Sequence, residues 1–369
     1  MLTFSGCSLQ SKTNTAPPQF TEVKEQKSND LYVKSIWLTY YELDNMAKGK
    51  TKSEFKENIS AAFKRLSNMD FNTVTVQVRA FADAVYESKY FKSRYSFDAL
   101  EIMCEVAEKH NLRLEAWVNP YRVSFDKNKK VSFDSTMLYK SGQGIYFNPA
   151  SDKVTKLIKK GVVEIVRNYN IYAIHFDDYF YPTTSKKIDK AEYSAYLKKG
   201  GKKSLSAWRR DKINNMVKTV YKAVKRTDSA VKFGISPSSN IKNDFETLYA
   251  DVEKWAKGGY CDYICPQIYF GFKNVYQPFM FTTKKWIGIT SCDLYVGLPL
   301  YKAGRADKYA ALEDKSVINE FKNNDNIISR QITYLSKLDE VKGFYIFSYS
   351  CLDDSRCKKE VDNMLKVLK

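Results

Sequence analysis

The strongest chemical signal in the sequence is a pair of adjacent aspartates, Asp177 and Asp178, at the end of a short apolar run that also contains His175. Two neighbouring carboxylates repel each other, so the pKa of one is raised toward the range that a general acid needs. We therefore predict that Asp177 and Asp178 are catalytic. The alternative is structural, because an aspartate after a strand often caps a helix or pairs with a cation, here Arg79, Arg122 or a lysine.

Metal binding is a second chemical interpretation of His175 and the two aspartates, because nitrogen and oxygen ligands can hold a divalent ion. The chain has two histidines, and the other, His110, is expected at the end of a helix, which argues against a zinc hydrolase. Its seven cysteines include no CxxC pair. Serine or cysteine nucleophile chemistry would lack a histidine partner and a GxSxG motif. We expect neither a metal nor another cofactor.

The elements that must position these groups follow from hydrophobic periodicity, which predicts eight strands alternating with helices. The predicted strands span 33–39, 71–79, 112–119, 171–177, 231–236, 262–269, 294–300 and 343–348. The predicted helices span 53–69, 96–110, 151–169, 207–227, 244–257, 278–288, 327–338 and 358–368. Strands separated by helices pair in parallel, and eight such units close into a single (β/α)8 TIM barrel of the α/β class.

The lengths of the connections support a barrel independently. Connections from helix to strand are short, whereas those leaving the strands are long, at 80–95, 120–150, 179–206 and 301–326. A barrel enzyme carries its site on the loops that follow its strands. The alternative, an open doubly wound sheet, would usually place a glycine-rich phosphate loop after the first strand, where the sequence reads Tyr-Tyr-Glu-Leu instead.

Polar and aromatic residues gather at the predicted carboxyl ends of all eight strands. Aromatic faces stack on sugar rings, while amides, hydroxyls and guanidinium groups bind ring hydroxyls. Any one of these residues alone is more often structural, but their convergence predicts a carbohydrate site. The predicted substrate-binding residues are Trp37, Tyr40, Gln77, Arg79, Asp83, Trp117, Asn119, Tyr121, Arg122, His175, Tyr179, Ser236, Ser238, Asn240, Gln267, Tyr269, Tyr301, Lys302 and Tyr349.

Composition narrows the class of protein and of partner. The 369 residues are 44% hydrophobic and 15% aromatic, which excludes a disordered chain, and no run of eighteen apolar residues occurs. The formal net charge is +18, but the lysines are interleaved with acids and form no recognised nucleic-acid module, so we expect no nucleic-acid partner. A positive surface suits an anionic membrane or wall polymer, or simply solubility. We expect a monomer.

The N-terminal segment resembles a bacterial lipoprotein signal that has lost its upstream part. Cys7 follows Leu-Thr-Phe-Ser-Gly, and residues 8–29 are polar without periodicity. We predict a signal remnant and flexible tether over 1–30, lipidated at Cys7, and a catalytic domain over 31–369. The protein would then be a lipoprotein on the extracellular face of the cytoplasmic membrane, touching the membrane only through this lipid, or be secreted. The alternative is an ordinary disordered N-terminus.

Several segments resemble the glycosyl-hydrolase-like family 10. The resemblance covers residues 33–350 and is carried by WLTYY at 37–41, QVRAFADAVY at 77–86, AWVNPYR at 116–122, YFNP at 146–149, IHFDDYFYP at 174–182, WRRD at 208–211, KFGISPS at 232–238, DYICPQIY at 262–269 and FSYS at 347–350. It implies a TIM-barrel glycoside hydrolase, often secreted or lipid-anchored in bacteria, with one branch associated with peptidoglycan strands stripped of their peptides. The chain departs from the family at Ala80 and Ala82, where Pro and Gly are frequent, and at Glu115, where His is common.

Together these features predict hydrolysis of a glycosidic bond in an N-acetylhexosamine polymer such as peptidoglycan. No carboxylate ends the seventh strand, so the usual second catalytic carboxylate of a retaining barrel enzyme is missing. Asp178 would be the general acid and Asp177 would orient the substrate's acetamido nucleophile, although the reverse assignment remains open. One alternative is an enzyme on a neutral glycan with Glu42, Asp83 or Glu115 as second carboxylate. The other is a non-catalytic wall-binding lipoprotein.

Overall fold

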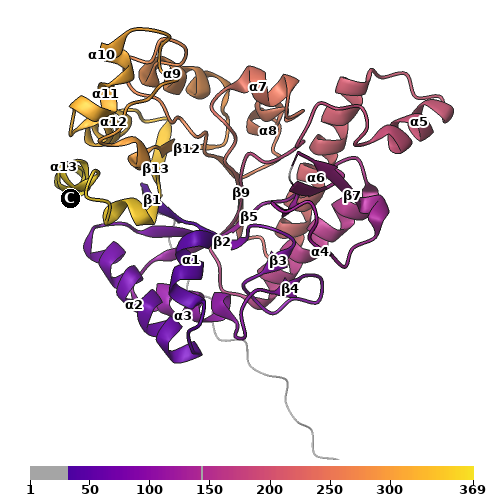
Figure 1. Cartoon of the computed structure of the whole chain (residues 1–369), viewed down its shortest axis with the longest axis horizontal. Helices are drawn as coiled ribbons and strands as arrows, with labels where there is room; N and C mark the ends of the chain where they lie inside the picture. The colour runs from indigo at the N-terminus through magenta and orange to yellow at the C-terminus, as the bar shows by residue number, and fades with distance from the viewer. Residues whose placement is uncertain (1–31, 143) are drawn as a thin grey trace, which may run out of the picture. The chain divides into compact units, whose positions relative to one another are not determined.

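Eight parallel strands close into a barrel in the computed structural model, which describes residues 32–142 and 144–369. Around the barrel the strands run β1 (Val33–Leu38), β2 (Thr73–Arg79), β5 (Arg113–Val118), β9 (Ala173–Phe176), β10 (Lys232–Ile235), β11 (Tyr263–Ile264), β12 (Asp293–Leu298) and β13 (Val341–Phe347), which pairs back with β1 (Figure 1). The predicted TIM barrel is confirmed. Cys7 and the predicted tether lie outside the described residues. Within the described part, no helix is both long enough and apolar enough to cross a membrane.

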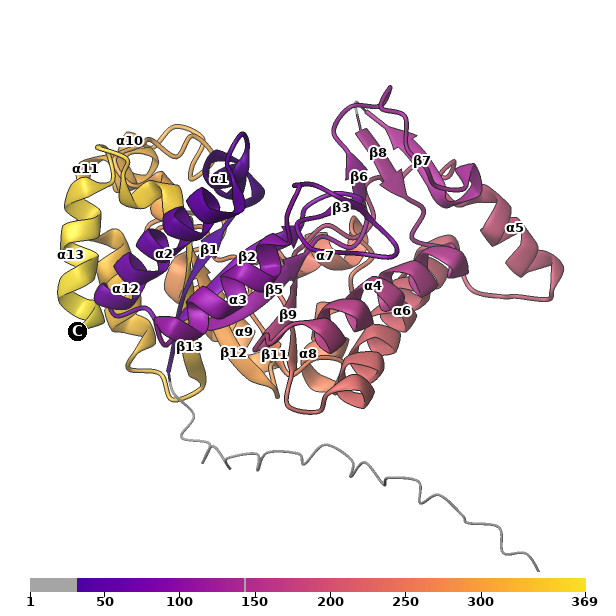
Figure 2. The ribbon, with the colours of Figure 1, turned by 90° about the horizontal axis from the view of Figure 1, so that it is seen from below.

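Helices form the outer layer of the barrel (Figure 2). They are α2 (Lys52–Asn68), α3 (Ala99–Lys109), α4 (Asp152–Asn168), α6 (Leu205–Thr227), α8 (Val252–Lys257), α9 (Phe279–Ile289), α12 (Ile327–Leu335) and α13 (Lys358–Leu368). Helix α2 illustrates why these segments are helical. Thr51 caps it by accepting a hydrogen bond from the Glu54 backbone N–H at 3.2 Å, and its apolar residues at helical spacing are buried against the barrel.

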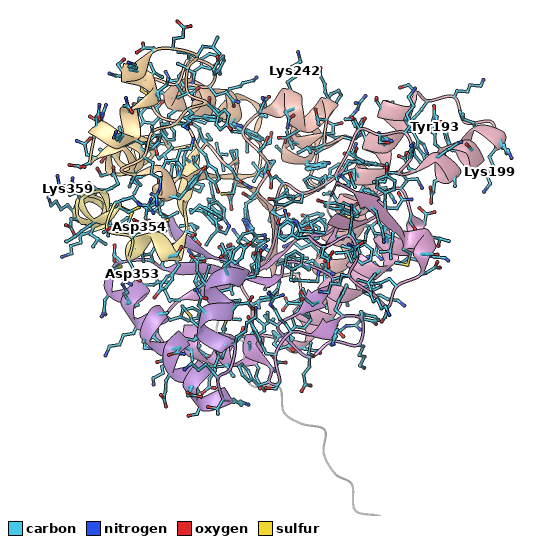
Figure 3. The ribbon with its side chains drawn as sticks, viewed as in Figure 1. Tyr193, Lys199, Lys242, Asp353, Asp354 and Lys359 are labelled. Carbon is cyan, nitrogen blue, oxygen red and sulfur yellow. The ribbon has the colours of Figure 1, made fainter. Side chains whose placement is uncertain are left out.

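Long excursions follow the carboxyl ends of the strands, and several contain elements that periodicity did not predict. They are α1 (Tyr40–Ala47), β3 (Asp83–Ala84), β4 (Lys92–Ser93), the antiparallel sheet of β6 (Arg122–Ser124), β7 (Leu138–Ser141) and β8 (Gly144–Phe147), α5 (Lys190–Lys198), α7 (Ile241–Glu246), α10 (Lys315–Ile318), α11 (Glu320–Asn323) and the short 3-10 helices η1 (Ser135–Met137), η2 (Leu300–Lys302) and η3 (Tyr349–Leu352). Tyr193 in helix α5 and Lys199 directly after it lie at the periphery (Figure 3).

A buried ion pair attaches the excursion after β9 to helix α6. The Arg209 guanidinium donates to both carboxylate oxygens of Asp189 at 2.7 Å, and neither side chain is exposed. The Tyr181 hydroxyl donates to the same carboxylate at 3.0 Å. The hydrogen bonds satisfy both charges in place of water, which is the condition under which a buried pair is tolerated.

The middle of the barrel is polar rather than purely aliphatic. The fully buried Glu115 carboxylate accepts hydrogen bonds from the Thr75 and Tyr345 hydroxyls, each at 2.8 Å, and Thr75 also bonds Ser35 at 2.9 Å. Burial raises the pKa of Glu115, while the hydroxyl donors oppose that rise. This network connects strands β1, β2, β5 and β13 directly beneath the mouth of the barrel.

Candidate active site

A cavity of about 340 Å³ opens at the carboxyl ends of the strands. It is lined by Trp37, Thr39, Tyr40, Tyr41, Gln77, Trp117, Arg122, Phe125, His175, Asp177, Asp178, Tyr179, Ser236, Gln267, Tyr269, Tyr301 and Phe347. Both predicted catalytic aspartates and most of the predicted substrate-binding residues are therefore brought together. The cavity combines aromatic walls with a few convergent polar groups, as carbohydrate sites do.

Asp177 is buried in the wall of this cavity and held by three donors. Its Oδ2 accepts from the Trp117 indole N–H at 2.9 Å and from the Asn119 amide at 3.2 Å, while its Oδ1 accepts from the Tyr179 backbone N–H at 3.3 Å. Burial, and then the charge of Asp178, raise the pKa of Asp177 to about 7, and the bond from Trp117 opposes that rise. The pair therefore retains a proton near neutral pH.

Asp178 is the more exposed member of the pair and faces the cavity. Burial raises its pKa above the usual range for aspartate, while Gln267 and the Arg122 guanidinium act in the opposite direction. Behind it, Asp244 is buried and accepts a hydrogen bond from the Ser238 hydroxyl at 2.8 Å. Burial raises the pKa of Asp244 to about 8, and the charge of Asp178 contributes to this shift.

His175 is a neutral imidazole. Its Nε2 accepts from the Trp37 indole N–H at 3.3 Å, so Nδ1 carries the proton and donates to the Tyr263 hydroxyl at 2.9 Å. Burial lowers the pKa of His175 to about 3. This histidine therefore orients Trp37 and does not shuttle protons. Among residues 32–142 and 144–369, no cluster of three or more His, Cys, Asp and Glu side chains is arranged to hold a metal ion.

The three other carboxylates considered from sequence do not line the cavity. Glu42 is buried and accepts from the Ser348 hydroxyl at 2.8 Å. Asp83 pairs with Arg94 at 2.8 Å, and Glu115 lies in the barrel network described above. Asp177 and Asp178 are thus the carboxylates that line the cavity within the described part of the chain.

Arg79 does not contribute to the cavity, although strict alternation along its strand predicts that it points inward. The pairing of β2 with β5 shifts register between Gln77 and Arg79, and this irregularity turns the Arg79 side chain away. Its guanidinium lies 4.3 Å from the centroid of the Phe91 ring and is fully buried. Arg79 therefore lies outside the cavity in which it was predicted to bind sugar.

Other predicted contacts also fall outside the cavity, each for a local reason. Asn119 is buried behind Asp177, and its Oδ1 accepts from the Arg122 backbone N–H at 2.9 Å, so it connects Asp177 to the Arg122 segment. Tyr121 is buried in the apolar core. Asp83 is held by Arg94.

The remaining four predicted residues serve as structural links. Ser238 bonds Asp244. Asn240 caps α7 by accepting from the Asn243 backbone N–H at 3.1 Å. Lys302 pairs with Asp307 at 2.6 Å. Tyr349 packs under the Arg65 guanidinium, outside the cavity.

Four cavity residues, Thr39, Tyr41, Phe125 and Phe347, were not among the predicted site residues. Tyr41 and Phe125 lie in excursions whose internal structure periodicity does not reveal. Phe347 follows the inward alternation of β13 through Tyr345, and that alternation was a usable signal.

The family of the chain follows from comparison with known proteins. The model of the family described as glycosyl hydrolase-like 10 matches residues 32–312. The chain belongs to this family. It is accordingly a glycoside hydrolase, and the barrel with its acidic cavity is the expected framework for that activity.

Curated proteins that are similar to the chain along most of its length are named as glycosyl hydrolases. The chain is 30% identical over 366 residues to the glycosyl hydrolase YngK of Bacillus subtilis, covering 88% of this chain and 69% of that protein. It is 26% identical over 340 residues to the glycosyl hydrolase DigH of Escherichia coli K12, covering 80% and 76%.

Solved structures share the fold at low identity. The glycoside hydrolase domain of PgaB from Bordetella bronchiseptica superposes with a TM-score of 0.61 at 10% identity, over 90% of this chain and 98% of that chain. The GH20 exo-β-N-acetylglucosaminidase of Vibrio harveyi superposes with a TM-score of 0.54 at 9% identity, over 90% and 54%. These likenesses establish the barrel architecture alone.

Proposed function

We propose that this glycosyl hydrolase-like 10 protein cleaves glycosidic bonds in N-acetylhexosamine polymers of the cell wall, namely peptidoglycan glycan strands. The observation that carries the proposal is that the carboxylates lining the described cavity are the adjacent pair Asp177 and Asp178. A two-carboxylate mechanism needs groups on opposite sides of the scissile bond, roughly 5 Å or more apart. An adjacent pair fits a reaction in which the substrate supplies its own nucleophile.

In the proposed reaction, Asp178 protonates the glycosidic oxygen as the bond to the anomeric carbon breaks. The acetamido oxygen of the same sugar attacks that carbon and forms a cyclic oxazolinium intermediate. Water then opens the intermediate, and Asp178, now ionised, accepts the proton of that water. Asp178 suits this role because it faces the cavity and its pKa is raised.

Asp177 is proposed to accept the N–H of the acetamido group and to stabilise the positive charge of the intermediate. Trp117 and Asn119 fix its carboxylate from behind, so its geometry does not depend on substrate. Trp37 and Trp117 offer rings for the sugar. Two buried polar atoms at the cavity, the Ser236 hydroxyl and the Arg122 Nε, have no partner among the described residues and are available to substrate oxygens.

The test is digestion of glycan strands freed of their peptides, with products identified by mass spectrometry. Wild-type protein is expected to release fragments, and a thiazoline that mimics the oxazolinium intermediate is expected to inhibit it. Asp177→Asn and Asp178→Asn are each expected to lose activity. Wild-type rates in both variants would refute the assignment, whereas glycan binding without turnover by wild-type protein would favour a non-catalytic wall-binding role.

We also propose that the protein acts outside the cytoplasmic membrane as a monomer, tethered by a lipid on Cys7. The polar segment 8–29 and the net charge of +18, which suits anionic wall polymers, support this placement. The test is fractionation of the producing cells. Cys7→Ala is expected to move the protein from the membrane fraction to the soluble one, and retention of the variant in the membrane would contradict the lipid anchor.

A further inference from the structure

A continuous row of aromatic rings forms one wall of the cavity and reaches solvent at its rim; all of its members except Phe81 line the cavity. The rings of Tyr41 and Tyr40 have centroids 4.0 Å apart, Tyr40 and Phe81 5.1 Å, and Phe81 and Phe125 5.0 Å. The Arg122 guanidinium then lies between Phe125, at 4.6 Å from its centroid, and Tyr179, at 3.7 Å. We call these five rings and Arg122 the aromatic ledge.

The aromatic ledge occupies one half of the barrel mouth. Its members come from the segments that follow β1, β2, β5 and β9, which are consecutive strands around the barrel. The opposite half contributes Tyr269, Tyr301 and Phe347, which pack together and are partly buried within the cavity wall.

The outer rings of the aromatic ledge are open to solvent but held in place. Tyr41, Phe125 and Tyr179 are 63%, 50% and 46% exposed, whereas Tyr40 and Phe81 beneath them are buried. Exposed aromatic surface next to a cavity marks a place where a ligand is bound. Since the buried rings support the outer ones, little side-chain entropy would be lost when a ligand stacks on them.

An ion-paired arginine supports the buried rings from the other side. The Arg94 guanidinium lies 5.4 Å from the centroid of Tyr40 and 5.9 Å from that of Phe81. Its nitrogens donate to Asp44 at 2.6 Å and to Asp83 at 2.8 Å. Asp83 therefore affects the aromatic ledge indirectly, because it holds the Arg94 guanidinium that packs against Tyr40 and Phe81.

Arg122 gives an independent sign of a ligand. Its side chain is more than nine-tenths buried between two rings and lines the cavity, yet its Nε has no acceptor among the described residues. A buried N–H group without an acceptor is costly unless a bound molecule supplies one. Hydroxyl and carbonyl oxygens of a sugar stacked on Phe125 or Tyr179 are suitable acceptors.

We propose that the aromatic ledge binds sugar rings of the glycan beyond the two that flank the scissile bond. This inference rests on the proposed function and extends it: the substrate would be a long chain of pyranose rings, not a disaccharide. Pyranose rings with equatorial substituents present apolar C–H faces that stack on aromatic rings. Because the aromatic ledge lies on one half of the mouth, the additional rings would extend to one side of the bond only.

The test compares N-acetylglucosamine oligomers of two to six sugars. Binding is measured by calorimetry to full-length Asp178→Asn protein, so turnover is not required. The ratio of affinity for the hexamer to that for the dimer is expected to fall about tenfold in Phe125→Ala and in Tyr41→Ala, the loss of one aromatic stacking contact each. Phe125→Tyr is expected to restore the ratio, because it keeps the ring.

Tyr309→Ala is the control, because Tyr309 is 88% exposed and does not line the cavity. An unchanged ratio in both ledge variants, or an equal loss for dimer and hexamer, would overturn the proposal. The N-acetylglucosamine oligomers could also fail to bind while oligomers of sugars without an acetamido group show the same change in affinity ratio. That result would support sugar binding by the aromatic ledge and would refute the acetamido mechanism. If wild-type protein cleaves the oligomers without any preference for length, the mechanism stands and the aromatic ledge fails.

Discussion

Trp117 donates its indole N–H to Oδ2 of Asp177 across 2.9 Å, between the neighbouring strand ends of β5 and β9. All three groups that bond Asp177 are N–H donors, which cannot accept a proton in return. They therefore favour the ionised form of Asp177. Since the pair retains a proton up to about pH 7, we infer that this proton resides on Asp178, where a general acid needs it.

The two aspartates are expected to differ in their dependence on the leaving group. Asp178→Asn should lower the rate on the natural glycan by about 10²–10⁴-fold, since protonation of the leaving oxygen is lost. It should lose much less on an aryl glycoside whose phenol leaves without protonation. Asp177→Asn should lose activity on both substrates. The measurement is the rate of each variant on the natural glycan and on the aryl glycoside. If Asp177→Asn, and not Asp178→Asn, regained activity on the aryl glycoside, Asp177 would be the general acid.

The alkaline side of the pH–rate profile is expected to report the last proton of the pair. Because burial and the charge of Asp178 raise the pKa of Asp177 to about 7, kcat/KM should fall above about pH 7 as that proton is lost. In Asp177→Asn the remaining carboxyl no longer faces a negative neighbour, so its pKa decreases. The alkaline limb of the residual activity should then move to lower pH, and a limb that stays or moves upward would contradict this coupling.

The same raised pKa has a consequence for stability. An unfolded aspartate ionises near pH 4, whereas the folded pair of Asp177 and Asp178 loses its last proton at a pKa of about 7. Wild-type protein should therefore lose stability as pH rises from 4 to 7, by about 2–4 kcal/mol from this coupled pair, whereas replacing one aspartate with an amide removes the coupling and with it much of this dependence. In thermal unfolding, the stability of Asp177→Asn relative to wild type should increase between pH 4 and 7. A constant difference across that range would argue against a raised pKa.

The buried pair of Arg209 and Asp189 is expected to be a major contributor to stability. Asp189→Ala leaves a fully buried guanidinium without its carboxylate and should cost about 3–5 kcal/mol in urea unfolding. Asp211→Ala removes an exposed partner of Lys203 in the same region and should cost less than about 1 kcal/mol. Equal costs in the two variants would mean that burial does not determine the strength of these pairs.

Substitution by alanine should change stability in opposite directions at two glycines. A Cβ on Gly234 would lie 1.9 Å from the ring of Tyr263, which bonds His175, so Gly234→Ala should destabilise the barrel by about 1–3 kcal/mol. A Cβ on Gly288, in helix α9, meets nothing within 4 Å. Gly288→Ala should stabilise by about 0.5–1 kcal/mol. Thermal melts of both variants test the packing at this interior position.

The barrel could be predicted from sequence because the relevant signals are local. Strand β2 reads Thr-Val-Thr-Val-Gln-Val, and the residues of α2 that repeat at helical spacing are the ones it buries. The strand predicted over 262–269 forms regular pairing only at β11, since Pro266 lacks the N–H that a ladder requires. Gln267 still bridges to Ser238 and Gly297, which preserves its place at the cavity.

The residues that were misplaced depend on features that spacing does not encode. The irregularity after Gln77 redirects Arg79, and Asn119 turns toward Asp177 and away from the cavity. Helix α1 begins at Tyr40, directly after the predicted first strand, in a segment that periodicity did not predict to be helical, and Tyr41 was therefore not among the predicted site residues. Tertiary contacts determine each of these outcomes, and one sequence gives no direct signal of them.

The Glu115 network constrains how the strands can align during folding. If the strand that carries Thr75 or the strand that carries Tyr345 slid by one residue past Glu115, the carboxyl group would lose the hydroxyl donor that this strand supplies. Such a misaligned barrel would bury a polar group without its hydrogen-bond partner, so competing alignments are disfavoured. The buried Glu115 carboxyl group thereby favours a single register of the barrel strands.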